Sequence, residues 1–405
     1  MTFRSLLGVA LAAAALCGLI LPLAVTEAGA RSILSEPLLA AFAVVAILIG
    51  LAFAGRGIRE LGSHFSFVAV EWFSIVSDAT VSGFVGLART RWLAAAVLVV
   101  LAHFGLLVLL AQLERAGTPG SGFWFLAVAA WLSAWLLTQL LAELRAHTDL
   151  LQRLIDLAIP LLFGLWLLFL WEVTVRGLAV PSVLLPAPSD IGIRIANSLS
   201  ILWADFAQTY LKAVVAGYVL GCGSGFLVAV LIDRSPFLKR GLLPIGNLVS
   251  ALPIVGVAPI MVMWFGFDWP SKAAVVVIMT FFPMLVNTVA GLNAAGAMER
   301  DLMRTYGASS SQSLVKLRLP AALPFIFNAL KINSTLALIG AIVAEFFGTP
   351  IVGMGFRISA EIGRMNTDMV WAEIAVAALA GSLTYGLLSV AERAATFWHP
   401  SYRKG

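Results

Sequence analysis

Long apolar stretches dominate this chain and constrain its fold more than any other feature. Ten of them approach the ~20 residues that an α-helix needs to cross a bilayer. They cover residues 5–26, 37–54, 92–113, 122–142, 157–175, 206–231, 242–266, 273–295, 322–346 and 370–391. This pattern predicts an all-α polytopic membrane protein with about ten transmembrane helices.

The composition excludes several other classes of protein. Hydrophobic residues make up 61% of the chain and charged residues 12%, against ~45–50% and ~25% in soluble domains. The net charge of +5 does not indicate a nucleic-acid reader, because the basic residues are scattered between apolar blocks. Two cysteines inside apolar runs and four widely separated histidines predict no disulfide framework and no metal site.

Basic residues set the expected orientation. With the N-terminus in the cytoplasm, most Lys and Arg residues fall on the cytoplasmic side, as membrane proteins prefer. Ten spans then place both termini in the cytoplasm. The first span precedes Ala28-Gly29-Ala30, which is similar to a signal-peptide cleavage site, but its apolar part is too long for one, so we expect an uncleaved anchor. Residues 57–90 are half-apolar and fit an interfacial helix or a re-entrant piece.

The chain divides into two parts of unequal character near residue 156. Residues 1–156 form a four-helix membrane extension with few polar residues at membrane depth. We interpret it as a scaffold around the rest, or alternatively as a docking platform for another membrane protein. Residues 157–405 hold six spans with longer and chemically richer connections.

The connection between the eighth and ninth spans, residues 297–320, is the most informative one. Glu299 and Asp301 stand in the first turn of a predicted short helix, where the helix dipole favours anions. Gly307 ends that helix, and Ser309 caps a second one with Gln312 as its capping-box partner. We expect Leu319-Pro320 to end the second helix. Such an ordered cytoplasmic segment fits a docking surface for a soluble partner.

The spacing in this segment resembles the EAA loop of permease subunits of bacterial ATP-binding-cassette (ABC) importers. Asp301-Leu302-Met303 is the first triplet, Gly307 follows after three further residues, and Leu317 follows after nine more, before Leu319-Pro320. Compared with the family's pattern, Asp301 replaces a Glu, Leu302-Met303 replaces Ala-Ala, and Leu317 replaces an Ile. The resemblance implies a coupling loop for an ATPase subunit, formed by Glu299, Asp301, Arg304, Gly307, Ser309, Leu317, Leu319 and Pro320.

Further stretches are similar to the nitrate/sulfonate/taurine-type members of that family. Among them are residues 185–189, 251–259, 264–266 and 344–348. The resemblance implies that the C-terminal six helices form a type I importer core. It also implies a pore of two such subunits, a homodimer for this chain, in the bacterial inner membrane. Two ATPase subunits that use ATP and Mg would drive it, and an external binding protein would deliver the solute.

Polar residues within the spans are candidates for the solute pathway, because charges at membrane depth are costly. The candidates are Asn287, Asn328, Lys331 and Glu345. For Lys331 the alternative is a tie to a carboxylate or carbonyl of another helix. For Glu345 both a structural and a gating role remain open.

Small residues and prolines predict how the helices pack. Gly217, Gly221 and Gly225 recur every four residues on one helical face, which favours close helix contact in lipid. Pro253, Pro259 and Pro283 lie within spans and predict kinks, either around a pathway or simply for packing.

These features together predict the pore-forming subunit of an ATP-driven importer for a small solute such as a sulfonate, taurine, nitrate or a thiamine precursor. The chain has no G-x-x-x-x-G-K-[S/T] phosphate loop, so we expect no catalysis and no cofactor in it. A secondary transporter or channel without ATPase subunits is the alternative, although repeated halves and ion-coupling carboxylates are not evident. A membrane-embedded enzyme would need a catalytic cluster that the sequence does not display.

Overall fold

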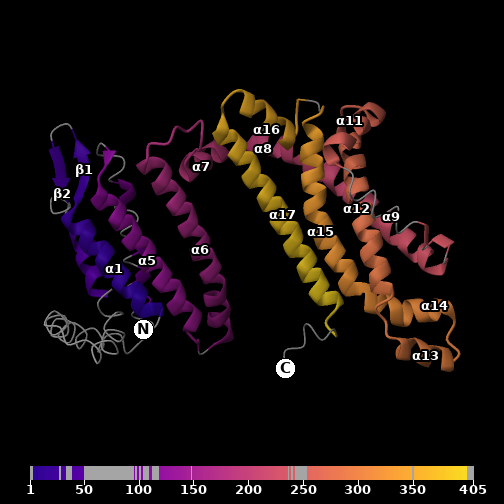
Figure 1. The fold of residues 1–405 in the computed structure, drawn as a ribbon. Helices are drawn as coiled ribbons and strands as arrows, with labels where there is room; N and C mark the ends of the chain where they lie inside the picture. The colour runs from indigo at the N-terminus through magenta and orange to yellow at the C-terminus, as the bar shows by residue number, and fades with distance from the viewer. Residues whose placement is uncertain are drawn as a thin grey trace. The chain divides into compact units, whose positions relative to one another are not determined.

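A computed structural model describes most of the chain. The described residues are 3–26, 29–32, 39–49, 95, 98–99, 102–103, 109–111, 118–146, 148–235, 237–238, 240–241, 253–348 and 351–398. They fall into two compact units, residues 1–189 and residues 190–405 (Figure 1). We describe each unit by itself.

Unit 1 is held together by apolar helix packing. Its helices are α1 (Phe3–Ile20), residues 39–49, α5 (Ser121–Glu143) and α6 (Asp149–Gly177). Leu11 of α1, Leu126 of α5 and Trp166 of α6 are almost fully buried in one core. A small antiparallel sheet joins β1 (Pro22–Thr26) to β2 (Gly29–Ser32) and β3 (Thr118–Pro119). The first predicted span is therefore too long at its end, because the helix stops before Pro22.

The described residues of unit 2 form a bundle of helices. Its long elements are α9 (Val215–Arg234), α12 (Trp269–Leu292), α15 (Leu319–Glu345) and α17 (Thr367–Ala395). Shorter helices connect them: α7 (Pro188–Asn197, which begins in unit 1), α8 (Leu199–Phe206), α11 (Ile254–Phe265), α13 (Ala297–Thr305), α14 (Ser310–Ser313) and α16 (Met354–Gly363). Two π-helical segments, η2 (Ala207–Val214) and η3 (Leu314–Arg318), continue into α9 and α15.

Helix α12 lies between α9 and α15 and packs along both (Figure 1). Glycines allow its close approach to α9. A Cβ atom on Gly217 would lie 2.5 Å from Val276 Cβ, and one on Gly225 would lie 2.5 Å from the Phe281 carbonyl oxygen. Gly221 faces Thr280 and Val277 in the same way. The three glycines therefore lie on the face of α9 that contacts α12.

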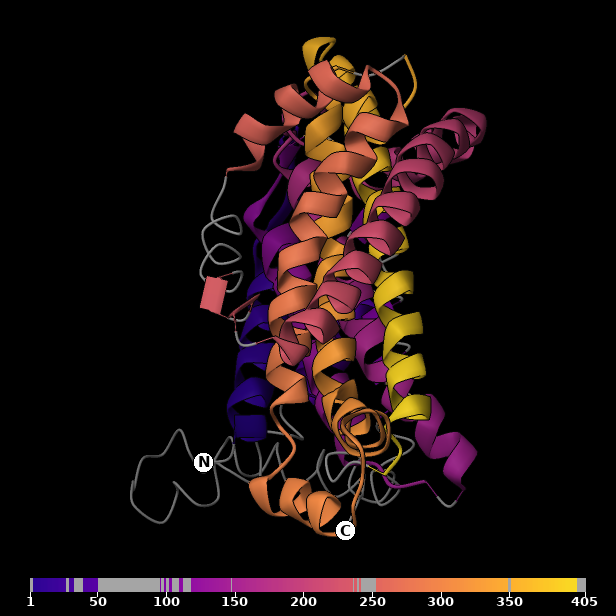
Figure 2. The same cartoon turned by 90° about the vertical axis from the view of Figure 1, so that its right-hand side faces the viewer.

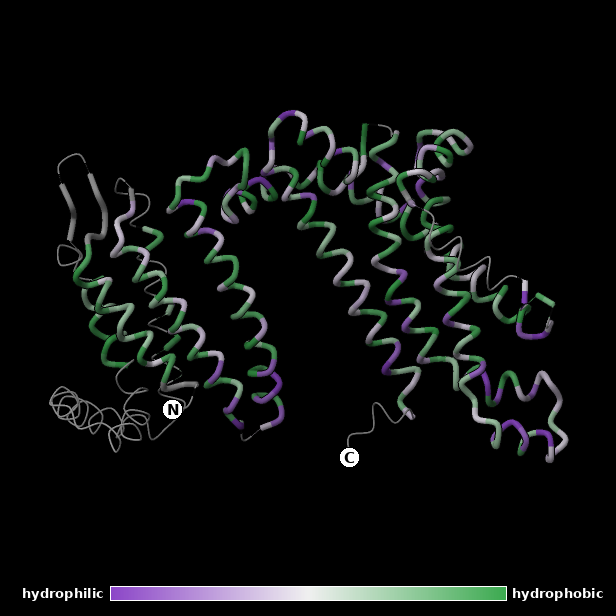
Figure 3. Tube along the Cα trace, viewed as in Figure 1, coloured by the Kyte–Doolittle hydropathy of each residue, from purple (hydrophilic) through white to green (hydrophobic). Residues whose placement is uncertain are grey.

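The bundle of unit 2 has two distinct ends. Helices α13 and α14 lie at one end, and α11 and α16 lie at the opposite end (Figure 2). We call these the α13 end and the α16 end. Hydrophobic residues follow the long helices between them, whereas hydrophilic residues gather along α13 and α14 (Figure 3). The all-α membrane fold is thus confirmed, with the small sheet of unit 1 as an addition.

Six helical segments among the described residues are long and apolar enough to cross a membrane. They are Ser121–Glu143, Asp149–Gly177, Leu199–Arg234, Trp269–Leu292, Ser310–Glu345 and Thr367–Ala395. Helix α1, residues 39–49 and α11 are apolar but shorter. The count of ten stays a prediction, because most of 92–113 and residues 242–252 lie outside the described residues, as does the whole of 57–90. The division at residue 156 also stays a prediction, and α6 runs through that position.

Candidate functional site

The segment at the α13 end is built as two short helices around one glycine. Helix α13 ends at Thr305, and Gly307 adopts φ +69°, a left-handed conformation that suits glycine. Ser309 then accepts the Gln312 N–H, and the Gln312 side chain accepts the Ser309 N–H at 2.8 Å. The predicted C′ glycine and capping box are confirmed. Both ends of the turn are therefore fixed by local hydrogen bonds.

Several large apolar side chains of this segment are exposed. Met298 and Tyr306 are 83% and 82% exposed, and Leu302 and Val315 are also exposed. None of the residues of α13 is buried. A polar helix that exposes large apolar side chains has the character of a contact surface for another molecule.

A partly buried ion pair ties the segment to the bundle. The guanidinium of Arg318 donates two hydrogen bonds to Asp233 at 2.6 and 2.5 Å, and its Nε donates to the Leu292 carbonyl at 3.0 Å. Arg318 thereby connects η3 to the ends of α9 and α12. A paired, planar guanidinium fixes geometry more firmly than a single hydrogen bond.

The prediction that Leu319-Pro320 ends the second helix is wrong. Residues 310–345 form one continuous helical stretch through η3 into α15. Pro320 is the second residue of α15, directly after η3, and the helical stretch continues through it. The stretch that begins after the Gly307 turn therefore continues without a break into α15.

The remaining coupling-loop candidates lie at or near the surface. Glu299 is exposed, and Asp301 pairs with Arg304 at 3.2 Å on the surface. Leu317, Leu319 and Pro320 are half-buried. The structure brings all eight candidates together in one segment, and their role in coupling stays a prediction.

The pathway candidates have different surroundings. Lys331 donates to Glu392 of α17 at 2.7 Å, which is the interhelical tie given above as the alternative to pathway lining. Asn287 donates to the Pro283 carbonyl of its own helix at 2.8 Å, and Asn328 is exposed on α15. Glu345 is 3% exposed at the α16 end. The structure does not bring these four residues to one site.

Buried polar residues organise the α16 end instead. Glu345 accepts hydrogen bonds from Thr209 of η2 at 2.7 Å and from the Gly355 N–H at 2.6 Å. Lys272, which is 1% exposed, donates to the carbonyls of Phe267 at 2.6 Å and of Gly348. These contacts join α12, η2, α15 and the beginning of α16.

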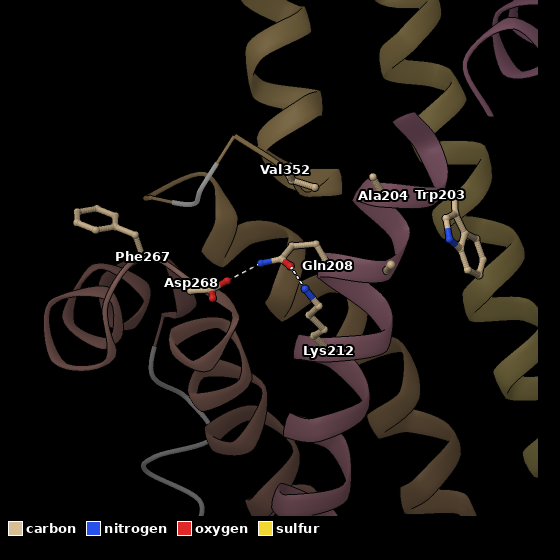
Figure 4. Close-up of a pocket in the computed structure, with 8 residues that line it drawn as sticks. Trp203, Ala204, Gln208, Lys212, Phe267, Asp268 and Val352 are labelled. Atoms are coloured by element: carbon tan, nitrogen blue, oxygen red, sulfur yellow. Dashed lines mark hydrogen bonds between the residues drawn. The ribbon is translucent and has the colours of Figure 1, made fainter. Parts of the chain in front are cut away.

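A pocket of about 800 Å³ lies beside these residues (Figure 4). Gln208 donates to Asp268 at 2.6 Å and accepts from Lys212 at 2.8 Å, which forms a chain of polar groups along its wall. Hydrogen bonds from the Trp269 N–H and from Gln208 lower the pKa of Asp268. Trp203 and Phe267 add aromatic surface to the lining.

Sequence reasoning missed Asp205, Thr209, Asp233 and Arg318 as structural centres. Asp205 is a charged residue next to an apolar run. The criterion that selected Lys331, a charge at membrane depth, therefore applied to Asp205 as well. Arg318 stands inside the recognised motif, but its partner Asp233 is 85 residues away in sequence. A pairing over that distance leaves no local signal.

Comparisons with known proteins agree with this architecture. Residues 213–397 match the family described as "Binding-protein-dependent transport system inner membrane component". The chain is 31% identical to the formylaminopyrimidine transport permease protein of Halalkalibacterium halodurans, over 59% of this chain and 95% of that protein. It is 30% identical to the putative aliphatic sulfonates transport permease protein of Bacillus subtilis, over 58% and 84% of the two chains. It is 28% identical to the taurine transport system permease protein of Escherichia coli, over 56% and 85%.

Proposed function

Because the chain belongs to the family of membrane-embedded permease subunits of binding-protein-dependent ABC importers, we propose that its α13 end binds a separate ATPase chain that drives solute inward. As a member of that family, the chain is a pore-forming multi-pass membrane subunit that is not itself a catalyst. The ATPase would bind ATP and Mg, and this chain would convert ATPase movement into helix movement.

The architecture of the α13 end carries this proposal. Exposed Met298 on α13 and exposed Tyr306 directly after it offer apolar contact area, and the Ser309–Gln312 capping box fixes the helix that follows. Arg318 fixes the segment to α9 and α12 through Asp233 and Leu292. Since η3 continues into α15, a push on α13 would move a membrane-crossing helix rather than bend a loop.

The finer assignments follow from this placement. The α13 end would face the cytoplasm of a bacterial cell, together with both termini, and the α16 end would face outward in the inner membrane. A second copy of this chain would complete the pore as a homodimer, and an external solute-binding protein would deliver solute to the α16 end. Residues 1–156 would form a membrane scaffold for this core.

The solute would be small and polar. Relatives are described as permeases for formylaminopyrimidine, aliphatic sulfonates and taurine. We propose the same range for this chain: a sulfonate, taurine, nitrate or a thiamine precursor. Competition between these solutes for uptake into proteoliposomes measures which of them is carried.

Co-purification from native membranes tests the function. The tagged chain should elute with an ATPase, and proteoliposomes of the eluate should take up solute only with ATP. The double variant Met298→Ala/Tyr306→Ala should lose the ATPase. The control Leu383→Ala removes a similarly exposed apolar side chain from the membrane-crossing part of α17 and should retain it. Uptake without any ATPase would instead support the secondary transporter or channel.

A further inference from the structure

The first turn of α16 is held by three side chains from three different elements. Asp205 of α8 accepts the Gly353 N–H at 2.6 Å, and Thr209 of η2 accepts the Met354 N–H at 2.8 Å. Glu345 of α15 accepts the Gly355 N–H at 2.6 Å. The free N–H groups at the start of a helix are thereby satisfied, and two carboxyl groups are drawn into one buried cluster.

Each of these two carboxyl groups accepts two hydrogen bonds. Asp205 is fully buried and accepts a second hydrogen bond from Arg357 Nε at 2.8 Å. Glu345 accepts its second hydrogen bond from Thr209. Hydrogen bonds and a guanidinium partner stabilise the charged form of a buried acid.

Glu373 of α17 completes the cluster and differs from the other two. It is fully buried, and neither of its carboxyl oxygens has a hydrogen-bond donor among the described residues. Helix α17 packs against α8, and the carboxylate of Asp205 on α8 acts on the Glu373 carboxyl group as a neighbouring negative charge. Two ionised carboxylates in contact repel each other, and neither can donate a hydrogen bond.

The surrounding charges do not neutralise an ionised Glu373. Asp205 adds negative charge, and Arg357 is already bonded to Asp205. Glu361 of α16 adds a further carboxylate, paired with Arg364 at 3.1 Å and lying 4.0 Å from Arg357. Lys272 of α12 is held by backbone carbonyls and faces Glu345. An ionised Glu373 would therefore be a buried charge without a compensating positive charge. A buried carboxyl group in such surroundings avoids that cost by taking up a proton.

We propose that Glu373 is a proton-binding site, a neutral carboxylic acid that donates its proton in a hydrogen bond to the Asp205 carboxylate. The shared proton satisfies the buried Glu373 carboxyl group and converts a repulsive pair into a bridge. The bridge ties α17 to α8, and through Asp205 to the first turn of α16. Loss of the proton leaves two facing carboxylates and loosens α17 at the α16 end.

Two matched substitutions on the same helix test the proposal with the full-length chain in lipid nanodiscs. Glu373→Gln retains the shape and donor capacity of a neutral acid, so its thermal unfolding midpoint at neutral pH should equal or exceed that of the unmodified protein. Glu392→Gln removes a buried carboxylate that pairs with Lys331 at 2.7 Å. Its unfolding midpoint should fall, because Lys331 then loses its counter-charge.

The pH dependence gives a second readout. A group that is protonated in the folded state contributes stability that is lost as the pH rises through its folded-state pKa. The unmodified protein should therefore lose thermal stability from neutral to alkaline pH relative to Glu373→Gln. An equal pH dependence in the two proteins, or a fall of the Glu373→Gln midpoint like that of Glu392→Gln, would overturn the proposal.

Infrared spectroscopy of the unmodified protein provides a test that does not depend on how the variants fold. Labelling with ¹³C-glutamate identifies glutamic-acid carbonyl bands, and a protonated Glu373 should give one at neutral pH. The band should be absent from Glu373→Gln and retained in Glu392→Gln. Absence of any protonated glutamic-acid band from the unmodified protein would show that Glu373 is ionised.

Discussion

The two ends of unit 2 use polar residues in opposite ways. At the α13 end, α13 has no buried residue, and the Asp301–Arg304 pair stands in solvent. At the α16 end, Asp205, Thr209 and Glu345 are buried and bind the backbone of α16. The first arrangement leaves a surface free for a partner, whereas the second fixes neighbouring helices to one another.

A π-helical segment accompanies each end. Segment η2 carries Thr209 to the α16 network, and η3 carries Arg318 to the ion pair with Asp233. Such segments interrupt the regular helical ladder and are frequent at functional sites. The contrast predicts that substitutions at the α16 end change stability, while substitutions at the α13 end change function.

The largest stability effect should come from Glu345→Ala. The substitution leaves the Gly355 N–H and the Thr209 hydroxyl without their acceptor in a buried site, at ~1–3 kcal/mol each. We expect the free energy of unfolding to fall by about 4 kcal/mol in a denaturant titration in mixed micelles. Glu299→Ala at the α13 end removes an exposed carboxylate and should change it by less than about 0.5 kcal/mol. An equal loss of stability in Glu345→Ala and Glu299→Ala would contradict the proposed difference between the two ends.

Arg318→Met should have the next largest effect and should join stability to function. The substitution removes the partner of Asp233, which is partly buried. The free energy of unfolding should fall by about 3 kcal/mol, the low end for breaking a buried ion pair. Solute uptake per ATP hydrolysed should fall, because the coupling segment loses its tie to α9 and α12. The double variant Arg318→Met/Asp233→Leu removes both charges and should recover stability but not coupling. Recovery of both would show that the pair acts only in folding.

The packing between the two ends gives a smaller effect. Gly217→Ala places a Cβ atom 2.5 Å from Val276 Cβ and 2.6 Å from the Ala273 carbonyl oxygen. Overpacking of this kind should lower the free energy of unfolding by about 2 kcal/mol. A Cβ atom on Gly223 of the same helix meets nothing within 4 Å, so Gly223→Ala should be neutral or stabilising by up to about 1 kcal/mol. A similar loss in both variants would contradict the α9–α12 contact.

Gly307→Leu should have the smallest effect on stability and a large effect on coupling. Leucine at φ +69° costs about 1 kcal/mol. Apart from its two neighbours in sequence, no atom of the described residues lies within 4 Å of a Cβ atom there, so the added bulk would meet a bound ATPase instead. ATP hydrolysis should continue while solute uptake falls. Gly307→Asn tolerates the left-handed conformation and should retain more uptake; normal uptake by the leucine variant would contradict the assigned contact.

Local features of the fold were readable from the sequence. Apolar length predicted the long helices, and the Gly307 turn and the Ser309–Gln312 capping box depend on neighbours in sequence. The Gly217, Gly221 and Gly225 spacing likewise marked one face of α9. Such features need only the chain within a few residues of each position.

Contacts between segments that are distant in the sequence could not be predicted from it. Asp205 meets Gly353 and Arg357 across about 150 residues, and Arg318 meets Asp233 across 85. The continuity of η3 into α15 was also missed, because a proline usually ends or interrupts a helix, whereas this helical stretch continues through Pro320. The identities of these partners depend on helix packing, which a single sequence does not encode locally.

Labelling of Tyr306→Cys tests the central claim most directly, in a background where Cys17 and Cys222 are replaced by alanine. A membrane-impermeant maleimide should react with this position in inverted membrane vesicles and not in intact spheroplasts. Addition of the purified ATPase should block the reaction, since Tyr306 is 82% exposed in this chain alone. Reaction from the outer side, or reaction that the ATPase leaves unchanged, would contradict the α13 end as the cytoplasmic ATPase contact.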